Sequence, residues 1–298
     1  MISEFLEYLE LELNRSHLTA TAYGRDLREF AAFLDKDEEM EDAANVSTAE
    51  VRAWLAEMAR NGLSPRSLRR KTQAVRAFFR WIQKQGEIKN NPAADVQLAK
   101  IGRKLPEFVR EQEMEEILDR PVQGGDPALN IRNKLIINIL YSCGIRRDEL
   151  AKITDADVDF YQKEIRVHGK RNKTRIIPVA DELLREIKEW QTVRDGLYAF
   201  PSPAPLICSK RGRMSGRGIY EIVHKLLMST GATHKSPHSL RHTFATSLLN
   251  NGAEINSVKE LLGHASLQST QIYTHLTFSD LKKAYDNAHP RSKKDTSD

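Results

Sequence analysis

Signals for helix ends recur along the first hundred residues, and they restrict this part of the chain to a small all-helical domain. Ser47-Thr48-Ala49-Glu50 is a capping box, and apolar residues at helical spacing follow it. Ser64 and Pro65 suit the start of the next helix, and Gly86 suits its end. These signals predict a compact set of helices that pack through their apolar faces.

The helical pattern lapses after Asn90-Asn91-Pro92, which indicates the end of this first domain. The segment Lys100 to Pro106 combines glycine, proline and cations, as linkers often do. We therefore expect one domain over residues 1–103 and a second over residues 106–298. A chain of 298 residues with 40% hydrophobic side chains is long enough to build two such cores.

Two runs of alternating residues interrupt the helical patterns of the second domain. Glu164 to His168 and Thr174 to Val179 flank the segment Gly169 to Lys173, and they predict an antiparallel hairpin. A further short strand is expected at Pro205 to Ser209. The predicted fold class is therefore mainly α, with an α-rich second domain that carries a small antiparallel sheet.

Charge and cysteine content indicate a compartment rather than an activity. The 46 Lys and Arg exceed the 41 Asp and Glu by a net charge of +5, which does not by itself indicate nucleic acid. The acidic first residues do not resemble a secretory signal, and the longest apolar stretch, around Leu135 to Ile145, is too short to span a bilayer. Cys143 and Cys208 form no CxxC pair, so we expect buried, reduced thiols. We expect a cytoplasmic protein without membrane contact.

The helix expected from Ser64 to Gly86 carries seven Lys or Arg and no acid. A solvated helix face normally mixes both signs, so this asymmetry favours contact with a nucleic-acid backbone over an ordinary exposed surface. Three of the arginines are spaced to form one stripe: Arg69, Arg76 and Arg80. The cations that we assign to DNA on this helix are Arg66, Arg69, Arg70, Arg76 and Arg80.

A second group of polar residues lies toward the C-terminus. A helix start just ahead of His238 places it on one face with Arg241, three residues later. Gly263 suits a helix end, with His264 directly after it. A zinc site at His238 and His242 would require a third ligand and usually an acidic base, which the neighbouring residues do not offer. We therefore expect no metal.

The side chains that attack on a phosphodiester requires are all present. Tyr273 offers a phenol as nucleophile, and its ordinary pKa of about 10 requires neighbouring cations or a base. Guanidinium groups can hold two phosphate oxygens at once, a role that suits Arg146 and Arg241. Lys170, within the expected hairpin, can give a proton to a departing 5′-oxygen. The imidazoles of His238 and His264 can hydrogen-bond the phosphate or take up the proton of the nucleophile.

These residues lie in segments that resemble the motifs of a known family. Gly144-Ile145-Arg146-Arg147-Asp148-Glu149-Leu150 resembles its first arginine box, Gly169 to Arg175 its lysine hairpin, and His238-Ser239-Leu240-Arg241-His242 its second arginine box. Leu261-Leu262-Gly263-His264 and Thr270 to His275 complete the set. Over essentially its whole length the chain is similar to the tyrosine recombinases. It is most similar to the Xer group, which resolves chromosome dimers for chromosome partition at cell division.

The resemblance implies an architecture and an assembly. Residues 1–103 would form a helical, SAM-like core-binding domain and residues 106–298 the catalytic domain, and the two would close around double-stranded DNA. Members of the family work as tetramers on two DNA sites and pass a C-terminal helix, here near Leu281 to Ala288, to a neighbouring subunit. A homotetramer and a heterotetramer with a related recombinase both stay open, as does dependence on a DNA translocase.

The resemblance also implies roles for single residues. Tyr273 would form a 3′-phosphotyrosyl bond, Lys170 would be the general acid, and Glu149 would support the site structurally. No cofactor or metal is implied, because one phosphodiester bond is exchanged for another through a covalent link. The residues that would activate the phosphate are Arg146, His238, Arg241 and His264.

Two segments differ from the residues that are usual in the family's motifs. Arg147-Asp148 stands where Val-Ser is common, and Arg171 replaces a frequent glycine; we assign Arg171 and Lys173 to DNA as well. Neither departure removes a reactive group. The expected function is recombination at a dif-like chromosomal site, and two alternatives stay open: a mobile-element integrase or excisionase, and DNA relaxation of the type IB topoisomerase kind. A DNA-binding regulator without catalysis is disfavoured, because Tyr273 and Lys170 are intact. The target sequence stays open.

Overall fold

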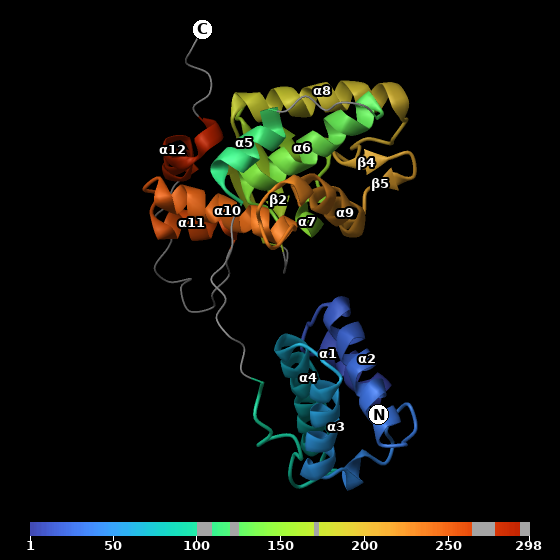
Figure 1. Ribbon diagram of the computed structural model, residues 1–298. Helices are drawn as coiled ribbons and strands as arrows, with labels where there is room; N and C mark the ends of the chain where they lie inside the picture. Colours follow the sequence, from blue (N-terminus) through green and yellow to red (C-terminus); the bar gives the residue numbers. More distant parts are fainter. Residues whose placement is uncertain (100–108, 120–124, 170–172, 264–277, 293–298) are drawn as a thin grey trace. The chain divides into compact units, whose positions relative to one another are not determined.

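The computed structural model describes residues 1–99, 109–119, 125–169, 173–263 and 278–292 (Figure 1). The chain divides into two compact units, Met1–Lys104 and Leu105–Asp298. Helices dominate both units, and the strands are few, short and antiparallel. The expected fold class is therefore confirmed.

The first unit is built from helices alone among its described residues. The aromatic side chains of Phe5, Phe78 and Trp81 pack together in its core, and Phe30 packs on Trp54 with ring centroids 4.8 Å apart. Its helices are α1 (Ile2–Leu11), α2 (His17–Phe33), α3 (Thr48–Arg60) and α4 (Pro65–Gln85), with a 3-10 turn at Ala43–Asn45.

The helix ends of this unit lie where the local signals place them. Ser47 and Glu50 form the reciprocal hydrogen bonds of a capping box at the start of α3. Ser64 caps α4, with Pro65 in its first turn. Gly86 ends that helix with a φ of 84°, a left-handed conformation that a glycine adopts without strain.

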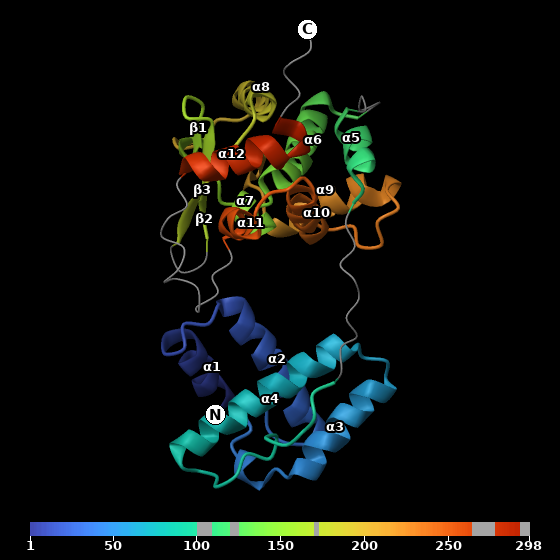
Figure 2. The same cartoon turned by 90° about the vertical axis from the view of Figure 1, so that its left-hand side faces the viewer.

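The second unit consists mostly of helices, with one three-stranded and one two-stranded antiparallel sheet. Helix α6 contacts α8, α9 and α10, and α12 lies against β3 and α10 (Figure 2). The helices are α5 (Glu111–Asp119), α6 (Pro127–Cys143), α7 (Arg147–Leu150), α8 (Asp181–Leu197), α9 (Gly216–Leu226), α10 (Pro237–Asn250), α11 (Ile255–Leu262) and α12 (Phe278–Ala288). The strands are β1 (Val158–Asp159), β2 (Glu164–His168), β3 (Thr174–Pro178), β4 (Cys208–Ser209) and β5 (Gly212–Arg213), and 3-10 turns lie at Asp155–Asp157, Leu227–Ser229 and Pro290–Ser292.

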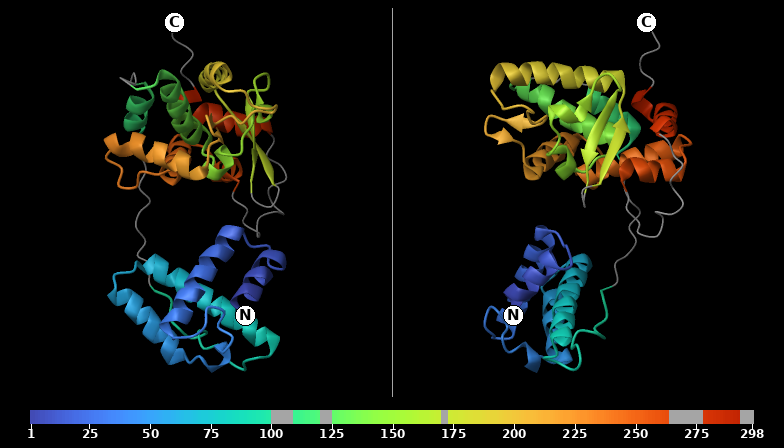
Figure 3. Two further views of the ribbon diagram at one scale, coloured as in Figure 1. Left: turned by 90° about the vertical axis from the view of Figure 1, so that its right-hand side faces the viewer. Right: turned by 180° about the vertical axis from the view of Figure 1, so that it is seen from behind.

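The predicted hairpin is confirmed. Strands β2 and β3 pair antiparallel with Ile165 opposite Ile177 and Val167 opposite Arg175 (Figure 3). Ile165, Val167 and Ile177 are buried, so this face of the sheet belongs to the core. The alternation of a strand places Arg175 on the same face as Ile177.

The strand expected at Pro205 to Ser209 is shorter in the structure, where β4 covers only Cys208–Ser209. The backbone just before it is hydrogen-bonded elsewhere. The amide of Leu206 donates to the carbonyl of Ile153, and Pro205 forms an isolated bridge with Thr154. The apolar residues of this segment are therefore buried by a connecting loop rather than by a sheet.

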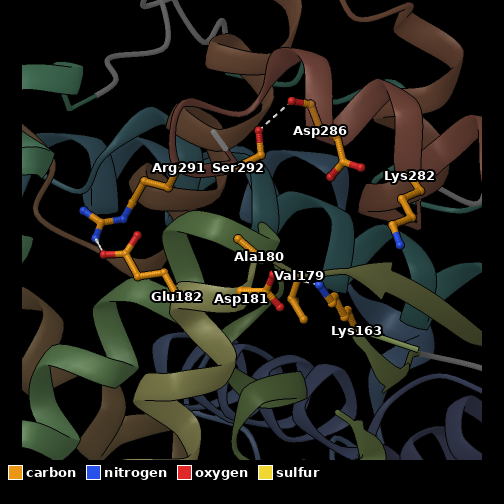
Figure 4. A pocket seen from close by; sticks show the side chains of 9 residues that line it. All are labelled: Lys163, Val179, Ala180, Asp181, Glu182, Lys282, Asp286, Arg291 and Ser292. Carbon is orange, nitrogen blue, oxygen red and sulfur yellow. Dashed lines mark hydrogen bonds and ion pairs between the residues drawn. The ribbon is translucent and has the colours of Figure 1, made fainter. Parts of the chain in front are cut away.

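Helix α12 packs on its own chain in this structure. Tyr285 and Leu281 join Phe244, Leu248 and Leu261 in a small apolar cluster between α10, α11 and α12. Just after the helix, Arg291 is 3% exposed and forms ion pairs with Asp119 and Glu182. Figure 4 shows the pocket beside this contact, where charged side chains of both signs gather around the start of α8.

Two further expectations concern the cysteines and the membrane. Cys143 and Cys208 are both buried and free, as expected. Among the described residues, no helix is both long and apolar enough to cross a membrane.

Candidate active site

Arg146 and Glu149 form the first element of the site, at the start of α7. Glu149 is 7% exposed, and its carboxylate accepts hydrogen bonds from the amide and the Nη1 of Arg146, both at 2.8 Å. The turn that leads into α7 is closely packed. Gly144 has a φ of 58°, and a Cβ there would lie 2.3 Å from Cδ1 of Phe244. A side chain at this position is therefore excluded both by the backbone and by α10.

Arg175 reaches the same carboxylate from β3. Its Nη2 donates to Oε2 of Glu149 at 2.8 Å and its Nη1 to Oε1 at 3.2 Å. Burial alone would raise the pKa of Glu149, but the hydrogen bonds from Arg175 and Arg146 outweigh it and lower that pKa to about 2. The carboxylate is therefore ionised and held between two guanidinium groups.

Arg241 lies in α10 and is 8% exposed. Its Nη1 donates to the carbonyl of Gly144 at 2.7 Å and its Nη2 to the carbonyl of Leu262 at 2.5 Å. Burial and the charge of Arg146 lower the pKa of Arg241 to about 10, so the group stays charged at pH 7. The second arginine box thus touches the turn before the first one.

His238 lies in the first turn of α10, on the exposed side of the same cluster. Partial burial lowers its pKa, and the charges of Arg147, Arg241 and Arg146 lower it further. A pKa below the usual value of 6.5 leaves the imidazole neutral at pH 7, with one nitrogen free to accept a hydrogen bond or a proton.

The structure therefore brings together three of the six predicted catalytic residues: Arg146, His238 and Arg241. The other three lie outside the described residues: Lys170, His264 and Tyr273. Arg171 is outside them as well. Lys173 is exposed just before β3, and its carbonyl accepts from the amide of Gly169 at 2.7 Å.

The described residues that precede Lys170 and His264 in the sequence lie beside Arg175 and Glu149. A Cβ at Gly169, which precedes Lys170, would lie 3.8 Å from both Nη1 of Arg175 and Oε1 of Glu149. Gly263 ends α11 with a φ of 63°, and a Cβ there would lie 3.1 Å from Cδ of Arg175. Gly169 and Gly263, the residues just before Lys170 and His264, therefore both lie next to Arg175.

Sequence reasoning missed Arg175 as a member of the site. The signal was present in the alternation of β3, because Ile177 is buried while Ile176 between them is 36% exposed. A cation on the apolar face of a strand requires a buried partner. That requirement pointed to a carboxylate, and Glu149 is the one that the structure supplies.

The unusual pair Arg147-Asp148 also faces the site. Nε of Arg147 lies 3.3 Å from Oδ1 of Asp148, and Arg147 is the first of the charges that lower the pKa of His238. The carboxylate of Asp148 lies against the start of α9, where a Cβ at Gly216 would be 2.2 Å from its Oδ1. The guanidinium of Arg147 therefore lies near His238, in addition to the three arginines already described.

The cations of α4 fall into two classes, which corrects the expectation of one solvent-facing stripe. Arg70 and Lys71 pair with the fully buried carboxylate of Asp26, and Lys71 also pairs with Glu29. Arg76 donates to the carbonyls of Ala93 at 3.0 Å and Val96 at 2.5 Å. These cations serve the core of the first unit. Helix α4 itself contains no acidic residue, and the carboxylates that pair with its cations, Asp26 and Glu29, lie on α2.

The remaining predicted cations of α4 are available to a ligand. Arg66 and Arg80 are exposed and Arg69 is half-buried. Within the part of the chain that the structure describes, none of the three has a hydrogen bond or an ion pair.

Among the described residues, no three His, Cys, Asp or Glu side chains are grouped so that they could hold a metal ion. The charged groups of the cluster described above are instead three arginines around one glutamate. Arg146, Arg175 and Arg241 outnumber the carboxylate of Glu149, so the site carries an excess of positive charge. Such a site is built to receive an anion.

Comparison with known proteins shows the family to which the chain belongs. The model of the Phage integrase family matches residues 107–280, and that of the Phage integrase N-terminal SAM-like domain matches residues 2–86. The tyrosine recombinase XerC of Corynebacterium glutamicum is 38% identical over 98% of this chain and 92% of its own length. The XerC of Oceanobacillus iheyensis is 37% identical over 98% of this chain and 96% of its own length.

Solved structures share the fold. The XerH recombinase bound to a palindromic difH substrate, in a post-cleavage complex, has a TM-score of 0.69 at 24% identity and covers 96% of this chain and 84% of its own. The Tn1549 transposon integrase in complex with circular intermediate DNA has a TM-score of 0.70 at 21% identity, over 95% and 97% of the two chains. At these identities the likeness concerns the fold.

We expect Glu149→Gln to lower the free energy of unfolding of the second unit by about 3 kcal/mol at pH 7. The folded-state pKa of about 2 lies below the usual 4.5, so the ionised carboxylate contributes stability above pH 4.5, and that contribution is lost as the pH falls toward 2. Unfolding by urea between pH 3 and pH 8 measures the difference, which should shrink with falling pH. Glu189→Gln, at an exposed carboxylate of the same unit, is the control. A constant difference across this range would contradict the assignment.

Proposed function

The chain belongs to the phage integrase family of tyrosine recombinases, and from this premise we propose how its residues break and rejoin DNA. Membership confirms the resemblance found in the sequence motifs. The chain is a site-specific recombinase, an enzyme that acts on DNA, with an N-terminal SAM-like domain and an integrase catalytic domain.

One observation carries the proposal for the site: two guanidinium groups bind one buried carboxylate, and a third, that of Arg241, lies beside them. Burial and the charge of Arg146 lower the pKa of Arg241 to about 10, and the arginines around Glu149 exceed it in charge, which favours the binding of an anion. A phosphodiester brings the missing negative charge, and its non-bridging oxygens gain more of it during attack. Arg146 and Arg241 would hold these oxygens with the N–H donors that their internal partners leave free.

In this proposal Tyr273 attacks the scissile phosphorus. The phenol loses its proton, its oxygen forms the 3′-phosphotyrosyl bond, and the bond to the 5′-oxygen breaks. Lys170 gives a proton to that departing oxygen. The neutral imidazole of His238, together with His264, binds the phosphate or takes up the proton of the phenol. Attack by a 5′-hydroxyl of the other DNA strand reverses these steps, so neither a metal nor ATP is required.

We assign DNA binding to both domains, residues 1–103 as the core-binding domain and residues 106–298 as the catalytic domain. In the first, Arg66, Arg69 and Arg80 are the expected α4 contacts that bind no other group among the described residues, and they would lie along the phosphate backbone. In the hairpin of the second, Lys173 and Arg171 would extend this contact.

The proposed biological role is the resolution of chromosome dimers at a dif-like site. The relatives that share 33 to 38% identity over nearly the whole chain are named XerC, whereas the likeness to transposon and phage integrases concerns the fold. A tetramer on two DNA sites, formed by this chain alone or with a related recombinase, would exchange the helix α12. A DNA translocase is a further partner under this role.

The proposal predicts that Tyr273→Phe abolishes the covalent adduct with a nicked suicide DNA substrate, because the variant lacks the attacking oxygen. Denaturing electrophoresis of labelled DNA after incubation measures the adduct. Tyr161→Phe is a matched control, since Tyr161 is 89% exposed on the β1–β2 turn, and it should trap as much DNA as the parent chain. Equal trapping by Tyr273→Phe would exclude Tyr273 as the nucleophile.

A plasmid that carries two target sites separates recombination from relaxation of the type IB topoisomerase kind. The parent chain, supplied with a partner recombinase where one is required, should yield two discrete circles. Products that differ only in supercoiling would instead support the topoisomerase alternative.

The α4 surface gives a separate prediction. Changing Arg66, Arg69 and Arg80 together to glutamine should weaken DNA binding and reduce the salt dependence by about one unit of slope for each lost phosphate contact. Binding titrations at several salt concentrations measure the slope. Arg76 is left intact, because its guanidinium holds the carbonyls of Ala93 and Val96.

The matched control for this experiment removes the same charge elsewhere in the first unit. Arg15, Arg52 and Arg60 are exposed and lie outside α4, and their change to glutamine should alter the slope far less. Equal slopes for the two triple variants would refute the α4 contact.

A further inference from the structure

Resting on the recombinase chemistry proposed above, we propose that Arg175 is a positioning residue that holds three segments of the active site together without binding the scissile phosphate itself. The three segments are the first arginine box, the entry to the lysine hairpin and the end of α11. Arg175 is the last residue of the lysine-hairpin motif, but it is not one of the six expected catalytic residues.

All three nitrogens of the Arg175 guanidinium are engaged inside the protein. Nη1 and Nη2 bind the two carboxylate oxygens of Glu149 at 3.2 Å and 2.8 Å, and Nε donates to the carbonyl of Leu261 at 2.8 Å. The side chain is 11% exposed. A planar guanidinium can satisfy two acceptors on different edges at once, which a lysine cannot do. Arg175 is therefore built as a bridge.

Arg146 differs from it in the way expected of a phosphate ligand. Its side chain is 34% exposed, and the hydrogen bond that its guanidinium makes within the described residues uses Nη1 alone. Both arginines share Glu149, so a shift of Arg175 would move the carboxylate against which Arg146 is oriented. Arg175 thus acts on the phosphate through Glu149 and Arg146.

The second contact of Arg175 fixes the end of α11. The last carbonyls of a helix have no partner within it, and they carry the negative end of its dipole. Arg175 binds the carbonyl of Leu261, and Arg241 binds that of Leu262. The residue that leaves this helix after Gly263 is the expected catalytic His264. The same guanidinium therefore relates the first arginine box to the segment that carries this histidine.

The third contact concerns the hairpin. Arg175 stands on β3, and Gly169 at the end of β2 approaches both its Nη1 and the Glu149 carboxylate. A Cβ at Gly169 would lie in van der Waals contact with this ion pair, 3.8 Å from each of these two atoms, and 3.2 Å from the carbonyl oxygen of Lys173. Lys170 follows Gly169 directly in the sequence.

The test separates positioning from binding and from folding. We expect Arg175→Gln to lower the single-turnover rate of adduct formation at saturating DNA by about 100-fold, a loss typical of misplaced catalytic groups. The dissociation constant for DNA should change by less than about twofold, because Arg175 makes no phosphate contact. Arg175→Lys keeps the charge but cannot bridge both acceptors, so it should recover only part of the rate.

A matched control removes a similar arginine from the same unit. Arg194 is 1% exposed and binds the carboxylate of Asp155 and the carbonyl of Pro205, so it shares the burial and the partner types of Arg175. Arg194→Gln should destabilise the fold but leave the rate of the folded protein at the parent's value. Urea unfolding of each variant shows which fraction is folded under the assay conditions. If Arg175→Gln does not fold, Arg175→Lys carries the comparison against Arg194→Lys.

A double variant tests the route through Glu149. Because Arg175 acts through that carboxylate, Arg175→Gln combined with Glu149→Gln should be little slower than the slower single variant. Multiplicative losses would overturn this route.

Two other outcomes would overturn the role of Arg175. A parental rate for folded Arg175→Gln would show that the bridge is dispensable. A loss of DNA affinity that equals the loss of rate, fully restored by lysine, would make Arg175 a phosphate ligand instead. Failure of the proposed function looks different, since the parent chain itself would then form no adduct.

Discussion

The ionised carboxylate of Glu149 is the interaction on which the order of the site depends. Two guanidinium groups meet on it, that of Arg146 from three residues earlier and that of Arg175 from β3, and a third, that of Arg241, lies beside them with its charge only partly offset. Removing one partner from such a buried cluster leaves the others uncompensated, which is costly in a medium of low polarity. The same excess of positive charge makes a phosphate a favourable addition. The same side chains therefore determine both the stability of the free protein and its affinity for a phosphate.

Local signals carried most of the fold prediction. Caps at Ser47 and Ser64, the glycine end of α11 and the alternation of β2 and β3 each involve residues close in sequence, so their outcome required no knowledge of the tertiary structure. The strand expected from Pro205 was too long, because its backbone is hydrogen-bonded to the loop at Ile153. That partner lies far away in the sequence, where a local pattern gives no information.

The same division holds for the site. Arg146, His238 and Arg241 could be found from their motifs, and the structure brings them together. Arg175 was overlooked because its role is defined by partners in α7 and α11. The roles expected of Lys170, His264 and Tyr273 stay predictions, and the adduct experiment tests that of Tyr273.

Helix α4 carries two kinds of positive charge that respond differently to ionic strength. Arg66, Arg69 and Arg80 are accessible to solvent ions, whereas Lys71 and its partner Asp26 are almost fully shielded from them. Mobile ions screen exposed charges over about 10 Å at moderate ionic strength, but they reach buried pairs far less. Raising the salt concentration should thus detach the helix from a polyanion while its anchorage to α2 persists. A high-salt wash should therefore release the first unit from nucleic acid in its folded state.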